Sequence, residues 1–457
     1  MAQGMIQKLI DTLMGVVESM HLRCEPADVE KTAVMVHRVM SYQARQFHTL
    51  DHVFGFLDGA DGITTLAAVF HDLIYYQVDD GLPSEVASLL DAYVECRGSE
   101  FLLRTDVPAE DPIFLLCSGV FGYKPGDRLR LLGGLNEYLS ALVMAALLHA
   151  HLDPKDIAAT AACIEASIPF RSPDTEGLDV GQSLERRLRA LAAAGRLDAD
   201  EGAIHAMVHR AIDFGNRDVQ DFALDDPGGF LANTWKLLPE SNASLRSKGT
   251  FSVREYRRAL QKMLGFFRSL DPDSIAHSYR GSPDEATMRR LSETTRRNLG
   301  YAQTYMRAKL LAVALVESVA ELSGGDAPMA LFMGDVPHDG SEYEGLMEYL
   351  PQLPAPPWLD TGNAVYRLLR DGRLDESSFD LKNSPLALYL YHRLKPSNWG
   401  AQSRASEAYF EGRLDALGFL HGFETGFLTD FLRALAAMVP TRRAALAALS
   451  PRIAPSS

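Results

Sequence analysis

The sequence contains few cysteines, and they are widely spaced. Only Cys24, Cys96, Cys117 and Cys163 occur among 457 residues, and no two of them form a C-x-x-C pair. This spacing argues against a zinc knuckle and gives no sign of a disulfide framework. The first residues predict an amphipathic helix instead of a secretion signal. Both observations favour a reducing, cytoplasmic location.

Long apolar runs and an excess of positive charge are also lacking. The longest apolar run, around residues 142–148, is far shorter than the roughly 20 residues that a membrane-spanning helix needs. Lys and Arg number 45 against 60 Asp and Glu, so the formal net charge is -15. We therefore expect no membrane insertion and no nucleic-acid partner. An anionic substrate would need local compensation from a metal ion or from arginines.

Sustained two-residue alternation, the pattern of a half-buried strand, is hard to find. Apolar residues recur instead at three- and four-residue steps, as at Ile6, Leu9, Ile10 and Leu13. This spacing is typical of amphipathic helices. The content of 47% apolar and 23% charged residues is that of a globular protein. We predict an all-α fold.

The chain is longer than one hydrophobic core usually serves. A helix-start signal at 282–285 (S-P-D-E) opens a periodic run to about Leu322, and Gly324 and Gly325 should end it. We predict a metal-binding helical domain over residues 1–281 and a helical C-terminal region of unknown role over 282–457. Within that region, the proline-rich stretch 337–358 predicts a loop. Its amphipathic helices suit contact with a protein partner or a second copy of the chain.

Potential metal ligands are concentrated in residues 47–75. His48 and His52 are four residues apart, so on a helix both imidazoles would point from one face. Further on, the apolar stretch A-A-V-F runs directly into His71 and Asp72. Burying this imidazole and carboxylate is costly unless both are paired or bind a cation. Nitrogen and oxygen donors suit a divalent ion such as zinc, iron, manganese or magnesium.

These residues resemble the HD superfamily of metal-dependent phosphohydrolases. One likeness is to its cyclic-nucleotide phosphodiesterase branch, in which Y-H-N-x-x-H precedes a helix carrying H-D. A closer likeness is to predicted bacterial HD hydrolases, in which R-x-Y-H-x-x-x-H precedes F-H-D-x-x-Y. The positions in step with that second pattern are Arg45, Phe47, His48, His52, Phe70, His71, Asp72 and Tyr75.

The resemblance implies roles for individual residues. His52, His71 and Asp72 would hold the metal, Asp72 would also take part in catalysis, and His48 would protonate the leaving oxygen. A closing aspartate is expected from A-I-D-F-G-N-R-D-V (211–219), where Asp213 is the first choice. Candidates for an alternative ligand or for substrate contacts are Asp218, Asn216, Glu165 and Arg171. The second histidine that the phosphodiesterase branch carries after H-D is missing, which favours a single metal.

The resemblance thus implies a metal-dependent hydrolase of a phosphate ester, either a nucleotide or another small phosphorylated metabolite. The nucleophile would be a metal-bound hydroxide. Two alternatives stay open. One is a non-catalytic HD fold that serves as a regulatory or protein-interaction scaffold. The other is an HD-type oxygenase with two irons.

Overall fold

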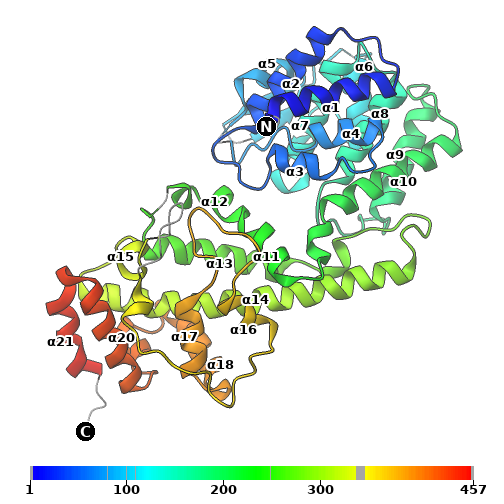
Figure 1. The fold of residues 1–457 in the computed structure, drawn as a ribbon. Helices are drawn as coiled ribbons and strands as arrows, with labels where there is room; N and C mark the ends of the chain where they lie inside the picture. The colour runs from blue at the N-terminus through cyan, green and yellow to red at the C-terminus, as the bar shows by residue number, and fades with distance from the viewer. Residues whose placement is uncertain are drawn as a thin grey trace. The chain divides into compact units, whose positions relative to one another are not determined.

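The structure of the protein is a computed structural model. This structure describes residues 4–79, 81–98, 100–108, 110–247, 249–335 and 345–453, without the side chain of Leu132. Most of these residues are helical (Figure 1), which confirms the predicted predominance of helices. The prediction of an all-α fold needs one correction, because a small three-stranded sheet is also present.

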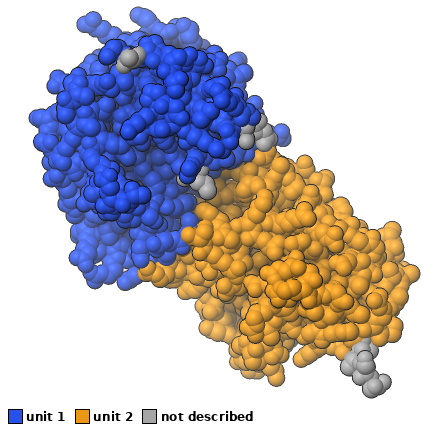
Figure 2. Space-filling model, turned by 180° about the vertical axis from the view of Figure 1, so that it is seen from behind, with its two compact units in different colours: residues 1–223, 270–294 blue, residues 224–269, 295–457 orange. Residues whose placement is uncertain are grey.

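The chain forms two compact units (Figure 2). Unit 1 comprises residues 1–223 and 270–294, and unit 2 comprises residues 224–269 and 295–457. Neither unit is contiguous in sequence, whereas the sequence predicted a single division between residues 281 and 282. Helical periodicity reports where helices lie, and it carries no information on which of them pack together.

The described residues of unit 1 form ten helices, three strands and short 3-10 turns, together with the first residues of α14. Its elements are α1 (Met5–Ser19), α2 (Pro26–Met40), α3 (Leu50–Gly55), α4 (Gly62–Phe70), α5 (Ser84–Leu90), β1 (Val94–Arg97), β2 (Glu100–Leu103), α6 (Pro112–Phe121), β3 (Arg128–Leu129), η1 (Leu131–Gly133), α7 (Leu135–Leu148), α8 (Pro154–Ala166), α9 (Val180–Ala193), α10 (Glu201–Asp218), η2 (Gln220–Ala223) and η4 (Pro272–Ser274).

Helix α8 lies at the centre of unit 1. It packs against α4, α6, α7 and α10, and its residues from Ile157 to its end are buried. Many of them are alanines, whose small side chains let neighbouring helices approach closely. Near the end of α10, a Cβ on Gly215 would come within 2.5 Å of the backbone oxygen of Ala166. The absence of a side chain at Gly215 therefore permits the contact that fixes the end of α10.

The three strands form an antiparallel sheet in the order β1-β2-β3. Val94 pairs with Leu103, and Phe101 pairs with Leu129. Strands of four, four and two residues are too short for a two-residue alternation to stand out from a helical pattern. Their buried side chains join the core of unit 1.

Unit 2 consists of helices and short 3-10 turns within the described residues. Its elements are α11 (Pro227–Trp235), α12 (Leu237–Ser241), η3 (Ala243–Arg246), α13 (Val253–Ser269), the larger part of α14 (Glu285–Ser323), α15 (Met329–Met333), η5 (Leu346–Glu348), α16 (Ala364–Arg370), α17 (Pro385–Arg393), α18 (Pro396–Phe410), α19 (Ala416–Leu420), α20 (Thr425–Met438), η6 (Pro440–Arg442) and α21 (Arg443–Ile453).

The long helix α14 confirms the predicted start and stop signals. It runs for 39 residues, and the Asp284 side chain accepts a hydrogen bond from the backbone N–H of Thr287. Gly324 and Gly325 follow it with φ values of 141° and 94°, which glycine adopts without strain. Its first residues belong to unit 1 and the rest to unit 2.

Two further predictions concern regions without long helices. The predicted loop at 337–358 falls partly outside the described residues, and its described part, 345–358, contains η5 and no other helix or strand. No helix in the described ranges combines the length and the apolar character needed to cross a bilayer.

Candidate metal centre

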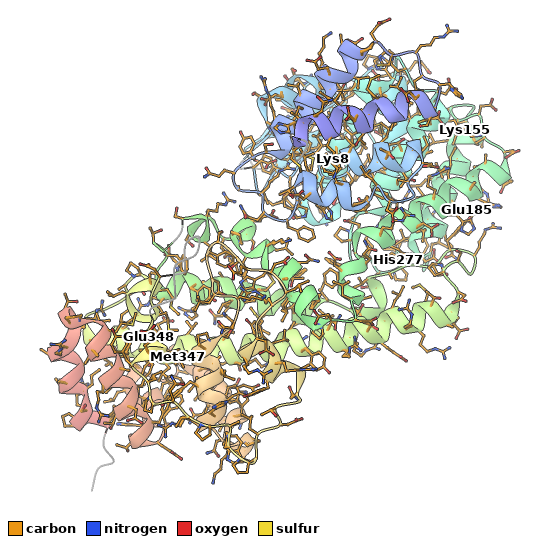
Figure 3. All side chains as sticks on the ribbon, in the orientation of Figure 1. Lys8, Lys155, Glu185, His277, Met347 and Glu348 are labelled. Atoms are coloured by element: carbon orange, nitrogen blue, oxygen red, sulfur yellow. The ribbon has the colours of Figure 1, made fainter. Side chains whose placement is uncertain are left out.

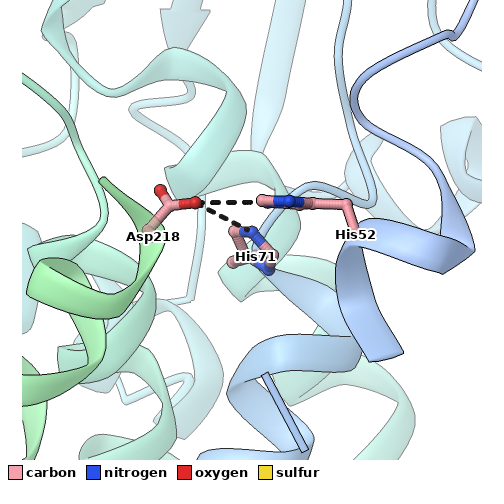
Figure 4. Close-up of side chains that lie close together, drawn as sticks. All are labelled: His52, His71 and Asp218. Atoms are coloured by element: carbon pink, nitrogen blue, oxygen red, sulfur yellow. Dashed lines mark hydrogen bonds and ion pairs between the residues drawn. The ribbon is translucent and has the colours of Figure 1, made fainter. Parts of the chain in front are cut away.

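Two imidazoles and a carboxylate from three helices meet in unit 1 (Figure 4). His52 belongs to α3, His71 follows the last residue of α4, and Asp218 is the last residue of α10. Oδ1 of Asp218 lies 3.2 Å from Nε2 of His52 and 3.8 Å from Nε2 of His71. Residues distant in sequence thus bring three potential metal ligands into one group.

A second carboxylate, that of Asp72, lies at the same place. Its Oδ2 atom is 3.0 Å from Nε2 of His71 and 3.7 Å from Nε2 of His52. Two donor atoms that each lie about 2.1 Å from one ion are about 3.0 Å apart at a right angle and about 3.4 Å apart at a tetrahedral angle. The nitrogen-oxygen distances cluster around these values, so the donor set fits a single divalent cation.

The His71 ring is oriented for ligation. Its Nδ1 lies 2.9 Å from the carbonyl oxygen of Ala68, so the proton resides on Nδ1 and the Nε2 lone pair is directed away from the helix. Nε2 is buried and has no hydrogen bond of normal geometry to any described residue. A buried imidazole nitrogen that faces two carboxylates, one of them at 3.0 Å, is an arrangement that a bound cation would suit.

Aromatic rings hold both imidazoles in place. The Phe56 ring lies 5.1 Å from each of the His52 and His71 rings, and the Phe214 ring lies 5.6 Å from the His71 ring. Phe56 and Phe214 are buried. These apolar walls fix the ring orientations and keep water from one side of the group.

Helix ends contribute to the charge at this place. The carbonyl ends of α4 and α10 lie at His71 and Asp218, where each helix carries a partial negative charge. A carboxylate at a helix C-terminus is unfavourable on its own. Together with Asp72, these groups concentrate negative potential that a cation would neutralise.

In the protein without metal, a proton on His71 neutralises part of this negative charge. Burial alone lowers the pKa of His71, but the carboxylates of Asp72 and Asp218 outweigh it and raise this pKa to about 9. Burial raises the pKa of Asp72, but the imidazoles of His71 and His48 hold it well below its usual range. Proton and metal would therefore compete for His71.

Arg45 supports the turn that carries His71 and Asp72. Its guanidinium donates to the carbonyl oxygens of Asp72 and Leu73 at 2.8 and 2.9 Å. It also forms a bidentate pair with Asp79 at 2.9 and 2.6 Å, and both side chains are fully buried. The arginine of the sequence motif thus holds the backbone at the end of α4.

The predicted helical pairing of His48 and His52 needs correction. Helix α3 begins at Leu50, so His48 lies outside it. The two rings still lie 6.4 Å apart, and the His48 ring stacks on Tyr75 with centroids 4.0 Å apart. His48 also interacts electrostatically with Asp72. The stack with Tyr75 replaces the helix as the support of His48.

The preference for Asp213 over Asp218 is reversed by the geometry. Asp213 is exposed on α10 and is not part of the group around His71, whereas Asp218 is. The sequence held a signal for this outcome, because Ile204, Ala211 and Asp218 are spaced at seven residues. Ile204 and Ala211 are buried, and positions seven apart share one helical face.

Asn216 does not contact the group, because its side chain joins two segments of unit 1. Its amide nitrogen donates to the carbonyl oxygen of His277 at 2.7 Å, and its oxygen accepts from the backbone N–H of His277 at 2.8 Å. His277 is labelled in Figure 3. Both ends of the Asn216 amide are thus used to fasten α10 to residue 277.

Glu165 forms ion pairs with two arginines, Arg171 and Arg187. The Glu165 carboxylate lies 2.5 Å from Nη1 of Arg171 and 2.6 Å from Nη2 of Arg187. Burial raises the pKa of Glu165, but the two guanidinium groups more than offset this and leave it lowered. Two cations on one carboxylate leave local positive charge in an otherwise acidic protein.

Glu137 is an acidic residue close to Asp72 and Asp218 that was not among the predicted site residues. Burial raises its pKa to about 7, with an added contribution from Asp72 and Asp218 and an opposing one from Arg171. Its Oε2 atom is buried without a hydrogen bond to any described residue. A single carboxylate in the buried helix α7, between Asn136 and Tyr138, was the available signal.

Glu185, Glu201 and His205 form a second group with ligand-like spacing. Glu185, labelled in Figure 3, forms an ion pair with Arg280. Arg189 forms ion pairs with both Glu185 and Glu201. Glu201 is exposed. Because arginines already neutralise these carboxylates, this group does not call for a cation.

Comparison of the chain with protein-family models, with curated proteins and with solved structures gives no match. The assignment of function therefore rests on the residues and their arrangement.

Proposed function

We propose that unit 1 is an HD-type helical domain and a metal-dependent hydrolase of small phosphate esters. The observation that carries the proposal is the convergence of His52, His71, Asp72 and Asp218, with the buried Nε2 of His71 facing both carboxylates. These four residues would hold one divalent cation. When bound, the cation would supply Lewis acidity to a phosphoryl oxygen and lower the pKa of a water molecule.

The surrounding residues suit the remaining steps of hydrolysis. The His48 ring stacks on Tyr75 and interacts electrostatically with Asp72. An imidazole is suited to protonate a leaving oxygen near neutral pH. Glu137, with a pKa of about 7, is a second proton carrier. Arg171 and Arg187 share one carboxylate. Their remaining positive charge would offset the negative charge of a phosphate group.

Metal content and turnover of the purified full chain test the proposal together. We expect about one divalent metal ion per chain and hydrolysis of at least one member of a panel of nucleotides and sugar phosphates. Asp72→Ala should remove both. Asp213→Ala, which changes an exposed aspartate outside the group, is the matched control and should retain both.

The other outcomes separate the alternatives. A full complement of metal without turnover of any ester would favour a non-catalytic scaffold. Two irons per chain with oxygen-dependent turnover would favour an oxygenase. A wild-type chain that binds no divalent metal would end the proposal.

A further inference from the structure

Unit 2 contains a buried group of charges that the proposed hydrolase does not use. Nζ of Lys309, on α14, lies 2.9 Å from Oδ2 of Asp380, and Nη1 of Arg373 lies 3.4 Å from the same oxygen. The Lys309 and Arg373 side chains are only 7% and 0% exposed. Two buried cations therefore share one carboxylate.

The positive charge is incompletely compensated. The indole of Trp235 faces both cations, 5.2 Å from Nζ of Lys309 and 4.3 Å from Cζ of Arg373. Such contacts stabilise a cation but leave its charge in place. A buried charge without a counter-ion is costly, and this group of two cations and one carboxylate carries one excess positive charge.

Polar groups beside Lys309 have unused hydrogen-bonding capacity. The Lys309 ammonium has three N–H groups, and it donates to Asp380 and, at 3.3 Å, to Oγ of Ser384. One donor is left over. The Tyr256 hydroxyl is buried next to Asp380 and is directed at that carboxylate, so the spare donor of this group belongs to Lys309.

A cavity opens onto these groups. It is lined by the polar side chains of Lys309, Asp380, Tyr256 and Ser384 and by apolar side chains such as Phe251, Val313 and Met329. Its volume is about 80 Å³, which is several times the roughly 10–15 Å³ that one water molecule needs. A ligand of this site therefore has a charged end and a small apolar body.

We propose that unit 2 binds a small organic monocarboxylate in this cavity. Its carboxylate accepts the spare N–H of Lys309, and its apolar body lies against Phe251, Val313 and Met329. One negative charge balances the one excess positive charge of Lys309, Arg373 and Asp380. A phosphate dianion would exceed that balance and would cost more to desolvate.

Thermal unfolding of the full chain with matched ligands tests the proposal. Benzoate and butyrate at millimolar concentration should raise the melting temperature, because a ligand that binds only the folded state stabilises it. Benzamide and butyramide, which have nearly the same shape without the charge, should not raise it. Methyl phosphate should have a smaller effect than the carboxylates.

Three variants separate binding from folding. Lys309→Met should weaken carboxylate binding at least tenfold in calorimetry, and without ligand it should melt no lower than the wild type, since Asp380 keeps Arg373 as its partner. Ala312→Leu fills the cavity and should also abolish the response while retaining every charge. Lys262→Met changes an exposed lysine and should bind carboxylates like the wild type.

Three results would overturn the proposal. One is that no carboxylate shifts the melting temperature of the wild type, and another is that amides or methyl phosphate shift it as much. The third is an undiminished response in Lys309→Met or in Ala312→Leu.

Discussion

At the scale of single residues, a proton and a metal ion compete for Nε2 of His71. Burial disfavours the charged ring, but Asp72 and Asp218 raise its pKa from 6.5 to about 9, so the metal-free protein holds this proton at neutral pH. A cation must displace it. We expect the apparent affinity for Zn²⁺ or Mn²⁺ to increase from pH 6.5 to 9 and to level off above that.

Calorimetric titrations at several pH values, in buffers of different ionisation enthalpy, measure both the affinity and the proton released. One proton per metal ion is expected near pH 7.5. An affinity independent of pH over this window would show that His71 is not protonated without metal.

Glu137 should make the metal-free protein less stable as the pH rises. Burial raises its pKa from 4.5 to about 7, so the folded state binds this proton more tightly than the unfolded state does. The stabilisation is complete below pH 4.5 and is lost as the pH rises through 7. Glu137→Gln stays uncharged, so its stability should not fall in this way as the pH rises. Melting temperatures measured in the presence of a chelator test this.

Wild type and Glu137→Gln should melt alike near pH 4.5 and diverge in favour of the variant toward pH 7.5. Asp213→Asn, at an exposed position, should follow the wild type throughout. Parallel curves for wild type and Glu137→Gln would mean that Glu137 ionises normally.

Removing one partner of the buried pair of Arg45 and Asp79 should strongly destabilise unit 1. Arg45→Met leaves a fully buried carboxylate without its partner and frees the carbonyls of Asp72 and Leu73, so we expect a loss of about 3–5 kcal/mol in the free energy of unfolding. Urea denaturation measures it. The double variant Arg45→Met/Asp79→Leu should recover part of the loss, and a single variant as stable as wild type would contradict the assignment.

At the scale of elements, the close approach of α10 to α8 positions Asp218. A Cβ at Gly215 would lie 2.5 Å from the backbone oxygen of Ala166, and backbone cannot move aside cheaply. Gly215→Ala should displace the end of α10, reduce stability by about 1–3 kcal/mol, and weaken metal binding by about 10–100-fold. Metal titration and urea denaturation measure the two effects.

Gly202→Ala is the matched control, since its Cβ would meet only an atom of Asp200 at 3.5 Å. It should bind metal like the wild type and unfold at the same or a higher urea concentration, because alanine favours helix. Equal metal affinity of Gly215→Ala and wild type would show that Asp218 tolerates a shift of α10.

Some of these elements could be predicted from the sequence, and others could not. The apolar stretch before His71 and the signals around α14 are local, so they indicated a buried helix end and a long helix correctly. The strands are too short to show a period. The choice between Asp213 and Asp218 depended on which face of α10 packs against α8, which becomes evident only when the buried series through Ile204 and Ala211 is extended to Asp218.

At the scale of the whole molecule, the two units are interleaved along the chain. A fragment of residues 1–281 would contain α11–α13 but none of α14 and none of the rest of unit 2. Trp235, 1% exposed in the full chain, would lose the Tyr305 ring that lies 5.8 Å away. We expect this fragment to bind a hydrophobic dye strongly and to aggregate, while the full chain does neither. A monomeric fragment with the dye fluorescence of the full chain would contradict this expectation.

The same interleaving sets an order for synthesis on the ribosome. All residues of unit 1 have emerged once Thr294 has left the exit tunnel, whereas α11–α13 emerge earlier and must wait for partners that are translated later. During that interval their apolar faces are available to chaperones or to other nascent chains. The rate of translation beyond residue 294 therefore determines how long this chain depends on such protection.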